Sequence, residues 1–288
     1  MTPTTDRTTL RLALPKGRMQ EEVFRLLADA GIRVRAGIRG YRPAISLPGC
    51  EVKLLKPQNI IEMLQAGSRD IGFAGADWVA ELGADVTELL DTGFDPVRLV
   101  AAAPEGLLED GRIPSRPLVV ASEYERLTRD WIRRRGLDAT CLRSYGATEV
   151  FPPEDADLIV DNTATGATLE ANDLVIVDEL MASTTRLFAN PRVLDDPEKR
   201  ASIERIVLLL RSVLDARRRV MLEVNVAPEL LESVCAVLPC MREPTISPLH
   251  GGAARFDAPA IPSSSLAAAL ASTALLAGEG WPRVHARA

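Results

Sequence analysis

Hydrophobic positions in the first hundred residues alternate between short continuous runs and helical stripes. Residues 10–15 form an apolar run that predicts a buried strand, and Lys16-Gly17-Arg18 follows it as a turn. The next stripe predicts a helix that Gly31 ends, with one apolar face formed by Met19, Val23, Leu26, Leu27 and Ala30. The alternation continues with predicted strands at 51–55 and 71–74 and predicted helices at 59–66 and 77–82. This order is typical of a mainly parallel sheet flanked by helices.

A second α/β series begins near residue 99. It contains predicted strands at 118–121, 139–143 and 158–160, a predicted helix at 123–135 and a helical turn at 147–151. We expect the chain to cross between two lobes near residues 99–103 and again near residues 175–188. The two series therefore predict two α/β lobes.

The strongest helical pattern covers residues 197–218. Pro197 suits the first turn of a helix, and the arginines at the other end complement the helix dipole. One apolar stripe contains Ile203, Ile206, Val207, Leu210, Val213 and Leu214. We expect this helix to pack against other elements rather than to carry chemistry.

The pattern changes after residue 219. Alternating apolar residues predict a half-buried strand over 220–226. Further predicted elements are helices at 228–238 and 263–277, strands at 245–249, 254–258 and within 281–285, and a turn at His250-Gly251-Gly252. The resulting order β-α-β-β-α-β is that of a ferredoxin-like module.

Charge and hydropathy narrow the range of partners. The 288 residues carry a net charge of −6 without a long acidic or basic block, so nucleic acid is not an expected partner. Residues 1–9 are polar and lack the apolar region of a signal peptide, and the longest apolar run, 266–277, is too short to span a bilayer. We expect a cytoplasmic protein with no membrane partner.

Few residues are available for nucleophilic or metal chemistry. The 2 histidines, His250 and His285, both lie near the C-terminus, and the 4 cysteines form no C-x-x-C pair. This distribution argues against a Ser-His-Asp set and against a zinc site. Catalysis is expected to depend on positioning and charge, without side-chain acid/base catalysis.

The segment DLIVDNTATGATLEANDL, residues 157–174, combines a buried strand with a loop of small and hydroxyl-bearing residues. Gly166 allows a close approach of the backbone, and Ala164 and Ala167 leave space. The possible ligands of a phosphate or ribose are Asp161, Thr163, Thr165 and Thr168. A phosphate-binding loop and a plain strand-to-helix turn with a threonine cap both remain open on this pattern alone.

The turn Lys16-Gly17-Arg18 follows the first strand in the same topological position. An isolated pair of cations after a strand is usually a solvated charge pair. Two such turns facing one cleft, with hydroxyls on one wall and cations on the other, suit a phosphate-rich substrate such as a sugar pyrophosphate or a nucleotide.

These segments resemble one enzyme family. The resemblance is to ATP phosphoribosyltransferase, the first enzyme of histidine biosynthesis. The segments that carry it are LRLALPKGRM (10–19), DIGFAGADWV (70–79) and residues 157–172 with the LVIVDE that follows Asp173. The segment after Arg219, including REPTISPL, resembles the regulatory third domain of the long form. The resemblance implies an α/β fold with a two-lobed catalytic core like that of periplasmic binding proteins, plus a C-terminal ferredoxin-like, ACT-like α+β regulatory domain. The implied boundaries are 1–100 with 181–218 for lobe I, 101–180 for lobe II and 219–288 for the regulatory domain.

The resemblance also implies the roles of the site residues. It places Thr165, Gly166, Ala167 and Thr168, beside Thr163, on the 5′-phosphate of phosphoribosyl pyrophosphate, and Asp161 near the ribose. It places Lys16, Gly17 and Arg18 near pyrophosphate or nucleotide phosphates and Lys56 near the nucleotide. Gly146 and Glu149 resemble positions of the family's G-S-V-E-x-A-P turn.

The implied reaction joins N1 of ATP to C1 of phosphoribosyl pyrophosphate and releases pyrophosphate. Mg²⁺ is expected on the pyrophosphate, with Asp161 as a candidate ligand, and L-histidine is the expected inhibitor. A homo-oligomer, dimer or hexamer, is expected. Two other hypotheses are a solute-binding module and a catalytically weak regulatory subunit that binds nucleotide or sugar phosphate.

Overall fold

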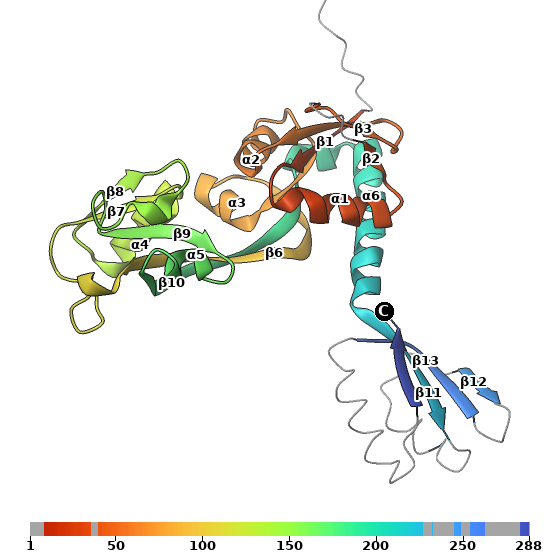
Figure 1. Ribbon diagram of the computed structural model, residues 1–288. Coiled ribbons are helices and arrows are strands. Elements are labelled where there is room, and N and C mark those ends of the chain that lie inside the picture. Colours follow the sequence, from red (N-terminus) through yellow and green to blue (C-terminus); the bar gives the residue numbers. More distant parts are fainter. Residues whose placement is uncertain are drawn as a thin grey trace, which may run out of the picture. The chain divides into compact units, whose positions relative to one another are not determined.

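The computed structural model of the chain describes residues 9–35, 40–226, 232, 245–248, 254–262 and 283–287 (Figure 1). The chain divides into two compact units, Met1–Val207 and Leu208–Ala288. The predicted turn at His250-Gly251-Gly252 and nearly all of the predicted helices at 228–238 and 263–277 fall outside the described residues. Within the described part of the chain, no helix is long and apolar enough to cross a membrane.

The first unit is built on one eight-stranded sheet with the order β4-β1-β5-β10-β6-β9-β7-β8. The strands are β1 (Leu10–Pro15), β4 (Cys50–Leu55), β5 (Ile71–Gly75), β6 (Thr87–Pro104), β7 (Leu118–Ser122), β8 (Ala139–Arg143), β9 (Leu158–Thr163) and β10 (Leu174–Ala189). A separate two-stranded sheet contains β2 (Val34–Arg35) and β3 (Ala44–Ile45). The sequence pattern did not predict these two short strands.

The helices predicted for the first unit are confirmed within a few residues at each end. They are α1 (Met19–Asp29), α2 (Pro57–Gln65), α3 (Ala76–Leu82), α4 (Glu125–Arg135) and α6 (Pro197–Arg217), and the 3-10 helix η2 (Thr148–Val150) lies in the predicted helical turn. The chain also forms α5 (Ala167–Glu170) and the 3-10 helices η1 (Glu105–Leu107) and η3 (Pro191–Asp195), for which the sequence pattern gave no bounds. The buried members of the predicted α6 stripe are Ile203, Ile206, Leu210 and Leu214.

The predicted parallel pairing is confirmed within each lobe, whereas the two strands that cross between the lobes pair antiparallel. β1 pairs in parallel with β4 and β5, and β7 pairs in parallel with β8 and β9. Between these two groups, β6 and β10 pair antiparallel with each other and with their outer neighbours β9 and β5. The two strands carry the chain between the lobes in opposite directions, as Figure 1 shows, so their long contact must be antiparallel.

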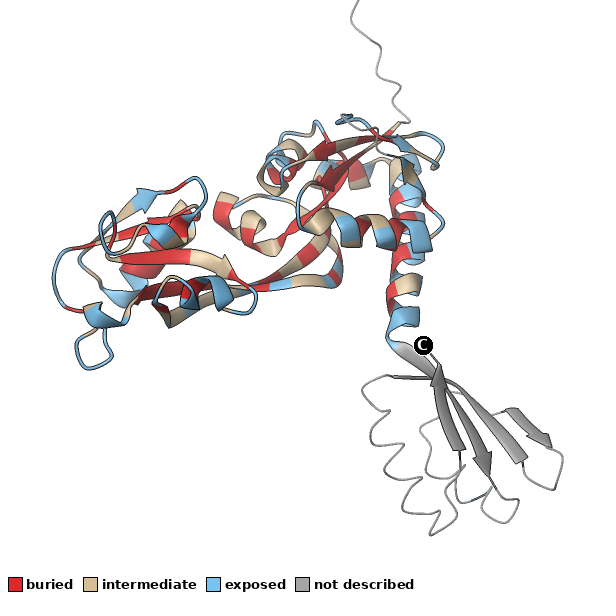
Figure 2. Ribbon diagram, in the orientation of Figure 1, coloured by how far each residue is buried: buried red, intermediate tan, exposed pale blue. Residues whose placement is uncertain are grey.

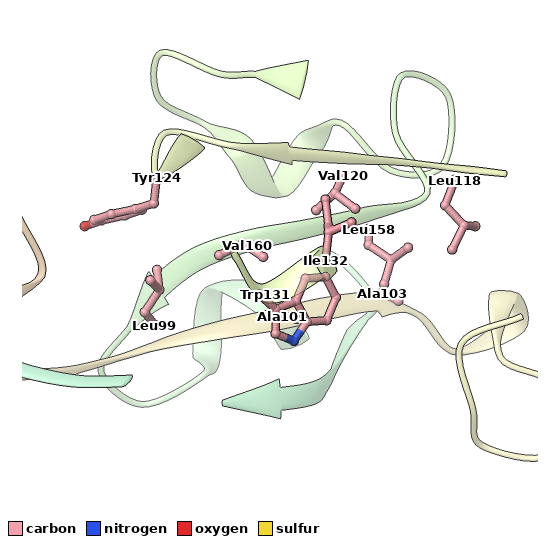
Figure 3. Packing of buried hydrophobic residues seen from close by; sticks show 10 residues of the cluster. All are labelled: Leu99, Ala101, Ala103, Leu118, Val120, Tyr124, Trp131, Ile132, Leu158 and Val160. Atoms are coloured by element: carbon pink, nitrogen blue, oxygen red, sulfur yellow. The ribbon is translucent and has the colours of Figure 1, made fainter. Parts of the chain in front are cut away.

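Alternation along β6 connects this strand to the cores on both faces of the sheet. Leu99, Ala101 and Ala103 belong to one buried cluster with Trp131 of α4, whereas Val100 and Ala102 belong to another cluster. Figure 3 shows the first cluster, with the Tyr124 hydroxyl directed away from the other labelled side chains. A third cluster in lobe I is formed by Ala13, Ile60, Ile61, Leu64, Ala74 and Phe188. Buried residues accordingly follow the strands of both lobes (Figure 2).

The second unit contains a four-stranded antiparallel sheet with the order β12-β13-β11-β14. Its strands are β11 (Arg219–Val226), β12 (Thr245–Pro248), β13 (Ala254–Pro262) and β14 (Arg283–Arg287). In chain order this is 2-3-1-4, the strand order of the ferredoxin-like sheet. The prediction of four strands after residue 219 is confirmed, and β13 extends further than the sequence pattern indicated.

Candidate functional site

The loop between β9 and α5 holds its shape through its own threonine hydroxyls. Gly166 has φ +89°, a left-handed conformation that glycine adopts without cost. Its N–H donates to Thr163 Oγ1 at 2.9 Å, and the Ala167 N–H donates to Thr165 Oγ1 at 3.3 Å. Each hydroxyl that accepts in this way keeps its own O–H for donation to another group. The loop therefore presents hydroxyl donors on a backbone that is already folded.

A pocket of about 370 Å³ opens beside this loop. Nine of the residues singled out in the sequence lie in its wall: Arg18, Gly146, Glu149, Asp161, Thr163, Ala164, Thr165, Ala167 and Thr168. Arg18 comes from lobe I, where it precedes α1, and the others come from lobe II. We call this cavity the loop pocket. It brings together a cation and a hydroxyl-rich loop that are more than 140 residues apart in the chain.

Lys16 and Lys56 lie instead in a second cavity of about 360 Å³. The Lys16 Nζ lies over the ring of Tyr41, 3.5 Å from its centroid. Gly17 lines neither cavity and has φ +80°, a value that suits a sharp turn between β1 and α1. The structure therefore separates the two cations of the Lys16-Gly17-Arg18 turn, which the sequence had grouped together. We call the second cavity the cationic cavity.

Arg18 is half exposed and is held loosely. Its Nε lies 3.6 Å from Asp95 Oδ1 of β6, and 54% of its side-chain surface is accessible. An exposed ion pair of this length contributes little to stability, so the guanidinium can be redirected toward an anion at small cost. Arg18 is thus the cation of lobe I that can act on a ligand in the loop pocket.

Asp161 is the most perturbed acid of the loop pocket. The pKa of Asp161 is raised to about 6, mainly by burial and also by the nearby charges of Glu149 and Glu123, against the opposing effect of hydrogen bonds from the Asn162 N–H and the Thr148 hydroxyl. The Asn162 N–H lies 2.7 Å from Asp161 Oδ1. A partly buried carboxyl with a raised pKa in a cleft is typical of a functional group. Its remaining oxygen positions suit ligand hydroxyls or metal-bound water.

Three further polar residues of this pocket were not predicted from the sequence. Glu123, Thr148 and Asn162 also line it. Glu123 follows β7, the parallel neighbour of β9, so the rule that ligands lie beyond the carboxyl ends of parallel strands could have indicated it. Asn162 Nδ2 donates to the hydroxyl of Tyr124 at 3.0 Å, a long-range contact that no local pattern encodes.

A buried hydrogen-bond network supports the pocket from behind. The Tyr124 hydroxyl donates to Asp77 Oδ2 at 2.6 Å, and Ser183 Oγ donates to Asp77 Oδ1 at 2.6 Å. Burial, followed by the adjacent Asp77 carboxylate, raises the pKa of Tyr124, so this hydroxyl stays a donor. The network connects α3 and β10 with Asn162 on β9, next to Asp161.

The pocket offers carboxylates for a metal ion but no closed cage. Among the described residues, no three acidic, histidine or cysteine side chains converge closely enough to hold a metal by themselves. Mg²⁺ in phosphate-binding enzymes is commonly held by one or two carboxylates together with substrate phosphates. Asp161 and Glu149 fit that kind of site.

These features define a class of protein. A two-lobed α/β core, with a threonine-rich loop of one lobe and an arginine of the other lining one cavity, is typical of proteins that bind a phosphorylated small molecule. A family model described as HisG, ATP phosphoribosyltransferase, matches residues 56–212, and one described as the HisG C-terminal domain matches residues 216–269. The chain belongs to the ATP phosphoribosyltransferase family, whose enzymes are pentosyltransferases of histidine biosynthesis.

Similar proteins support this assignment over most of the chain. ATP phosphoribosyltransferase of Pelotomaculum thermopropionicum is 39% identical over 249 residues, which cover 83% of this chain and 85% of that protein. The enzyme of Chlorobium phaeovibrioides is 37% identical over 245 residues, 83% of each chain. A chain of the ATP phosphoribosyl transferase (HisG:HisZ) complex from Thermotoga maritima superimposes with a TM-score of 0.65 at 27% identity, covering 72% of this chain and 100% of that chain.

Proposed function

We propose that the loop pocket and the cationic cavity together bind phosphoribosyl pyrophosphate and ATP, and that N1 of ATP displaces pyrophosphate from C1 of the sugar. The observation that carries the proposal is that Arg18 of lobe I and the loop of lobe II line one cavity. The leaving group is already activated, so aligning the two substrates and offsetting charge on pyrophosphate are sufficient roles for the protein.

In this proposal the loop holds the 5′-phosphate of phosphoribosyl pyrophosphate. Thr165 and Thr168 are exposed, and their hydroxyls can donate to phosphate oxygens. Gly166 allows the phosphate to approach the backbone of the turn into α5. Thr163 is buried and receives the Gly166 N–H, so it orients the loop from behind.

Asp161 and Arg18 act at the reacting end of the sugar. The ionised Asp161 carboxylate accepts hydrogen bonds from ribose hydroxyls, and Arg18 offsets negative charge that develops on the departing pyrophosphate. Glu149 and Gly146 line the same pocket. Asp161 and Glu149 would hold Mg²⁺ on the pyrophosphate, where the ion would supply charge neutralisation.

Lys16 and Lys56 act on nucleotide phosphates from the cationic cavity. The backbone fixes both positions, because the Lys16 N–H donates to Leu55 O at 2.9 Å, immediately before Lys56. The two lysines thus approach a ligand from adjacent strand ends, β1 and β4. No side chain serves as a general acid or base in this scheme.

The second unit is proposed to be the regulatory domain. Its strand order and the match to the HisG C-terminal domain support a sensor that binds L-histidine and inhibits the transferase. The proposal also includes the domain boundaries: 1–100 with 181–218 for lobe I, 101–180 for lobe II and 219–288 for the regulatory domain. The chain is further proposed to assemble as a homo-oligomer, either dimer or hexamer, in the cytoplasm.

The test is pyrophosphate release by the purified full chain with Mg²⁺, ATP and phosphoribosyl pyrophosphate, omitting each substrate in turn. We expect release only when both substrates are present, and suppression by added L-histidine. Saturable binding of both substrates without release would favour a catalytically weak regulatory subunit. Pyrophosphate release that L-histidine does not suppress would support the transferase activity and contradict the proposed histidine sensor.

A further inference from the structure

A third cavity, of about 360 Å³, lies at the amino ends of the lobe I strands. Its polar lining residues are Arg11, Asp70, Asn190, Arg192, Asp196 and Lys199. Arg11 and Lys16 are five residues apart along β1, which is about 17 Å of extended chain. The third cavity also shares no lining residue with the loop pocket or the cationic cavity. We call it the basal cavity, and it is separate from both cavities assigned to the substrates.

Most carboxylate oxygens of the basal cavity are already engaged by the protein. Asp70 Oδ1 accepts from Arg11 Nη2 at 2.7 Å, and Asp70 Oδ2 accepts from the Arg11 N–H at 2.7 Å and from Lys199 Nζ at 3.0 Å. Asp196 Oδ1 accepts from the N–H groups of Glu198 and Lys199 at the start of α6, at 3.0 and 3.2 Å. Asp196 Oδ2 accepts no hydrogen bond from a described residue.

The cations of the basal cavity keep N–H groups that no described residue accepts. The Arg192 guanidinium and Arg11 Nη1 have no acceptor within the described part of the chain. Lys199 Nζ donates once, to Asp70, so two of its three N–H groups remain, although only 12% of its side chain is exposed. Three cations therefore share two carboxylates, and the surplus charge is positive. A partly buried donor without an acceptor costs free energy, which a bound anion would restore.

A buried asparagine fixes the wall that carries Arg192. Only 6% of Asn190 is exposed, and its Oδ1 accepts from the Arg192 N–H at 2.8 Å while its Nδ2 donates to Leu64 O at 2.6 Å. The Asn190 N–H donates to Asp70 O at 2.9 Å. The backbone around the cavity is thus held in place, and the exposed Arg192 side chain is left to turn toward a ligand.

We propose that the basal cavity binds a phosphate group that retains one proton, either inorganic phosphate or the phosphate of a small monoester. Arg192, Lys199 and Arg11 donate to its ionised oxygens, and its protonated oxygen donates to Asp196 Oδ2. Sulfate has no proton at neutral pH, so it would place an ionised oxygen against the Asp196 carboxylate. The volume of the cavity leaves room for the organic part of an ester. This site adds to the proposed function and does not depend on it.

The experiment measures phosphate binding to the full chain at pH 6 by calorimetry, with sulfate at equal ionic strength for comparison. Phosphate monoesters have a second pKa of about 6, so a large fraction keeps its proton under these conditions. Arg192→Gln removes the exposed cation of the basal cavity. Arg205→Gln is the matched control, because Arg205 is an exposed arginine of α6 that lines none of the three cavities.

Two further variants report on the other places where phosphate could bind. Arg18→Gln removes the cation of the loop pocket. Lys53→Met removes one cation of the cationic cavity, whose wall has no carboxylate and contains Lys16, Arg42, Lys53 and Lys56. If phosphate binding is lost in either of these variants but not in Arg192→Gln, the anion occupies only the substrate cavities and the basal site is rejected.

We expect Arg192→Gln to weaken phosphate binding about tenfold or more, the effect of one lost charge-assisted hydrogen bond, and Arg205→Gln to leave it unchanged. Wild-type protein should bind sulfate at least about tenfold more weakly than phosphate. Asp196→Asn should remove this preference, because the amide keeps an oxygen for the helix cap and offers an N–H to sulfate. Equal affinity for the two anions in the wild type would mean non-specific anion binding and overturn the proposal.

Unfolding and activity separate this site from structure and from catalysis. Without ligand, Arg192→Gln should unfold at the wild-type temperature, and phosphate should raise that temperature less than in the wild type. KM for both transferase substrates should be unchanged in Arg192→Gln, and a raised KM would overturn the separation from the substrate cavities. Glycerol phosphate distinguishes the two sources: tighter binding than inorganic phosphate identifies a monoester, and weaker binding identifies the free anion. If phosphate binding depends on Arg192 but no pyrophosphate is released, the proposed function fails and the basal site stands.

Discussion

The loop pocket and the cationic cavity have similar volumes but opposite charge patterns. The loop pocket combines threonine hydroxyls and Arg18 with the carboxyl groups of Glu123, Glu149 and Asp161. The cationic cavity has basic residues and no carboxyl group in its wall. The first suits a ligand that carries hydroxyls and a metal ion as well as phosphate, whereas the second suits a bare polyphosphate chain.

Both cavities hold charge that is unfavourable without a ligand. Burial and neighbouring carboxylates raise the pKa of Asp161 to about 6, and neighbouring guanidiniums lower the pKa of Lys53. By contrast, Arg11, Asp70 and Lys199 form a cluster of paired charges in the first unit. Functional sites commonly reduce the stability of a fold in this way. Substitutions in the cavities should therefore leave the unfolding free energy unchanged or raise it, whereas substitutions in the paired cluster should lower it.

The largest effect is expected for Asp161→Asn. The amide keeps the size of the side chain but not its charge, so pyrophosphate release should fall about 100-fold or more. The unfolding free energy at pH 7 should rise, by at most about 3 kcal/mol, because a buried carboxylate no longer needs to ionise. Activity assays and urea unfolding measure the two quantities.

Asp155→Asn is the control for this substitution, since Asp155 is an exposed acid of the same lobe outside the pocket. It should leave both activity and stability near wild type. Full activity of Asp161→Asn would remove Asp161 from the reaction. A lower unfolding free energy of Asp161→Asn would mean that the folded protein stabilises the Asp161 carboxylate instead of disfavouring its charge.

A second comparison sets Lys199→Met against Lys53→Met. Lys199 Nζ lies 3.0 Å from Asp70 Oδ2, and only 12% and 3% of the two side chains are exposed. Removing Lys199 should lower the unfolding free energy by about 1–3 kcal/mol, the range for a lost hydrogen bond to a charged group. Removing Lys53, for which the described residues provide no ion-pair partner, should not measurably lower the unfolding free energy. Equal losses in the two variants would contradict the distinction between paired and unpaired cations.

Acid should weaken the same paired cluster. Burial opposes ionisation of Asp70, but hydrogen bonds from Arg11 and Lys199 outweigh it and lower the pKa of Asp70. A carboxyl whose folded pKa is lowered stabilises the fold above its unfolded pKa of about 3.9, and this contribution is lost as pH falls through the folded value. Asp70→Asn should show less loss of unfolding free energy between pH 5 and pH 3, measured by urea titration, than the wild type. If Asp70→Asn and the wild type lose the same unfolding free energy between pH 5 and pH 3, Asp70 is excluded as a source of the acid destabilisation.

The sequence predicted local elements well because their signals are local. β1 and β8 have the predicted bounds, and Gly31 ends the first helix as expected. Strand direction in β6 and β10 could not be predicted, because near-continuous apolar runs do not distinguish parallel from antiparallel pairing.

The predicted residues that line the loop pocket come from three local motifs, namely Arg18, Gly146 with Glu149, and the loop that begins at Asp161. The loop with Asp161 was found from local composition, but Arg42 and Lys53 come together only through pairing of β4 with distant segments. Lys16 and Arg18 are neighbours in the chain and still enter different cavities, because the turn at Gly17 directs them apart. Such divergence depends on backbone angles that composition does not encode.

The smallest effect is expected for Gly166→Ala, with Gly31→Ala as its matched control. Both glycines have a left-handed φ, +89° and +78°, and an added Cβ would meet no atom within 4 Å at either position. The two substitutions should therefore cost the same strain, about 1 kcal/mol of unfolding free energy. A difference between them in activity cannot come from stability.

Gly166 differs from Gly31 because its N–H donates to Thr163 within the loop. Relief of the strain at residue 166 would turn this N–H and the Thr165 hydroxyl away from the pocket. KM for phosphoribosyl pyrophosphate should therefore rise about threefold to tenfold in Gly166→Ala, and KM for ATP should not change, since ATP phosphates are assigned to the other cavity. An equal rise in both KM values would show that the two cavities act as one site, and an unchanged KM for the sugar substrate would show that the loop does not need its left-handed turn.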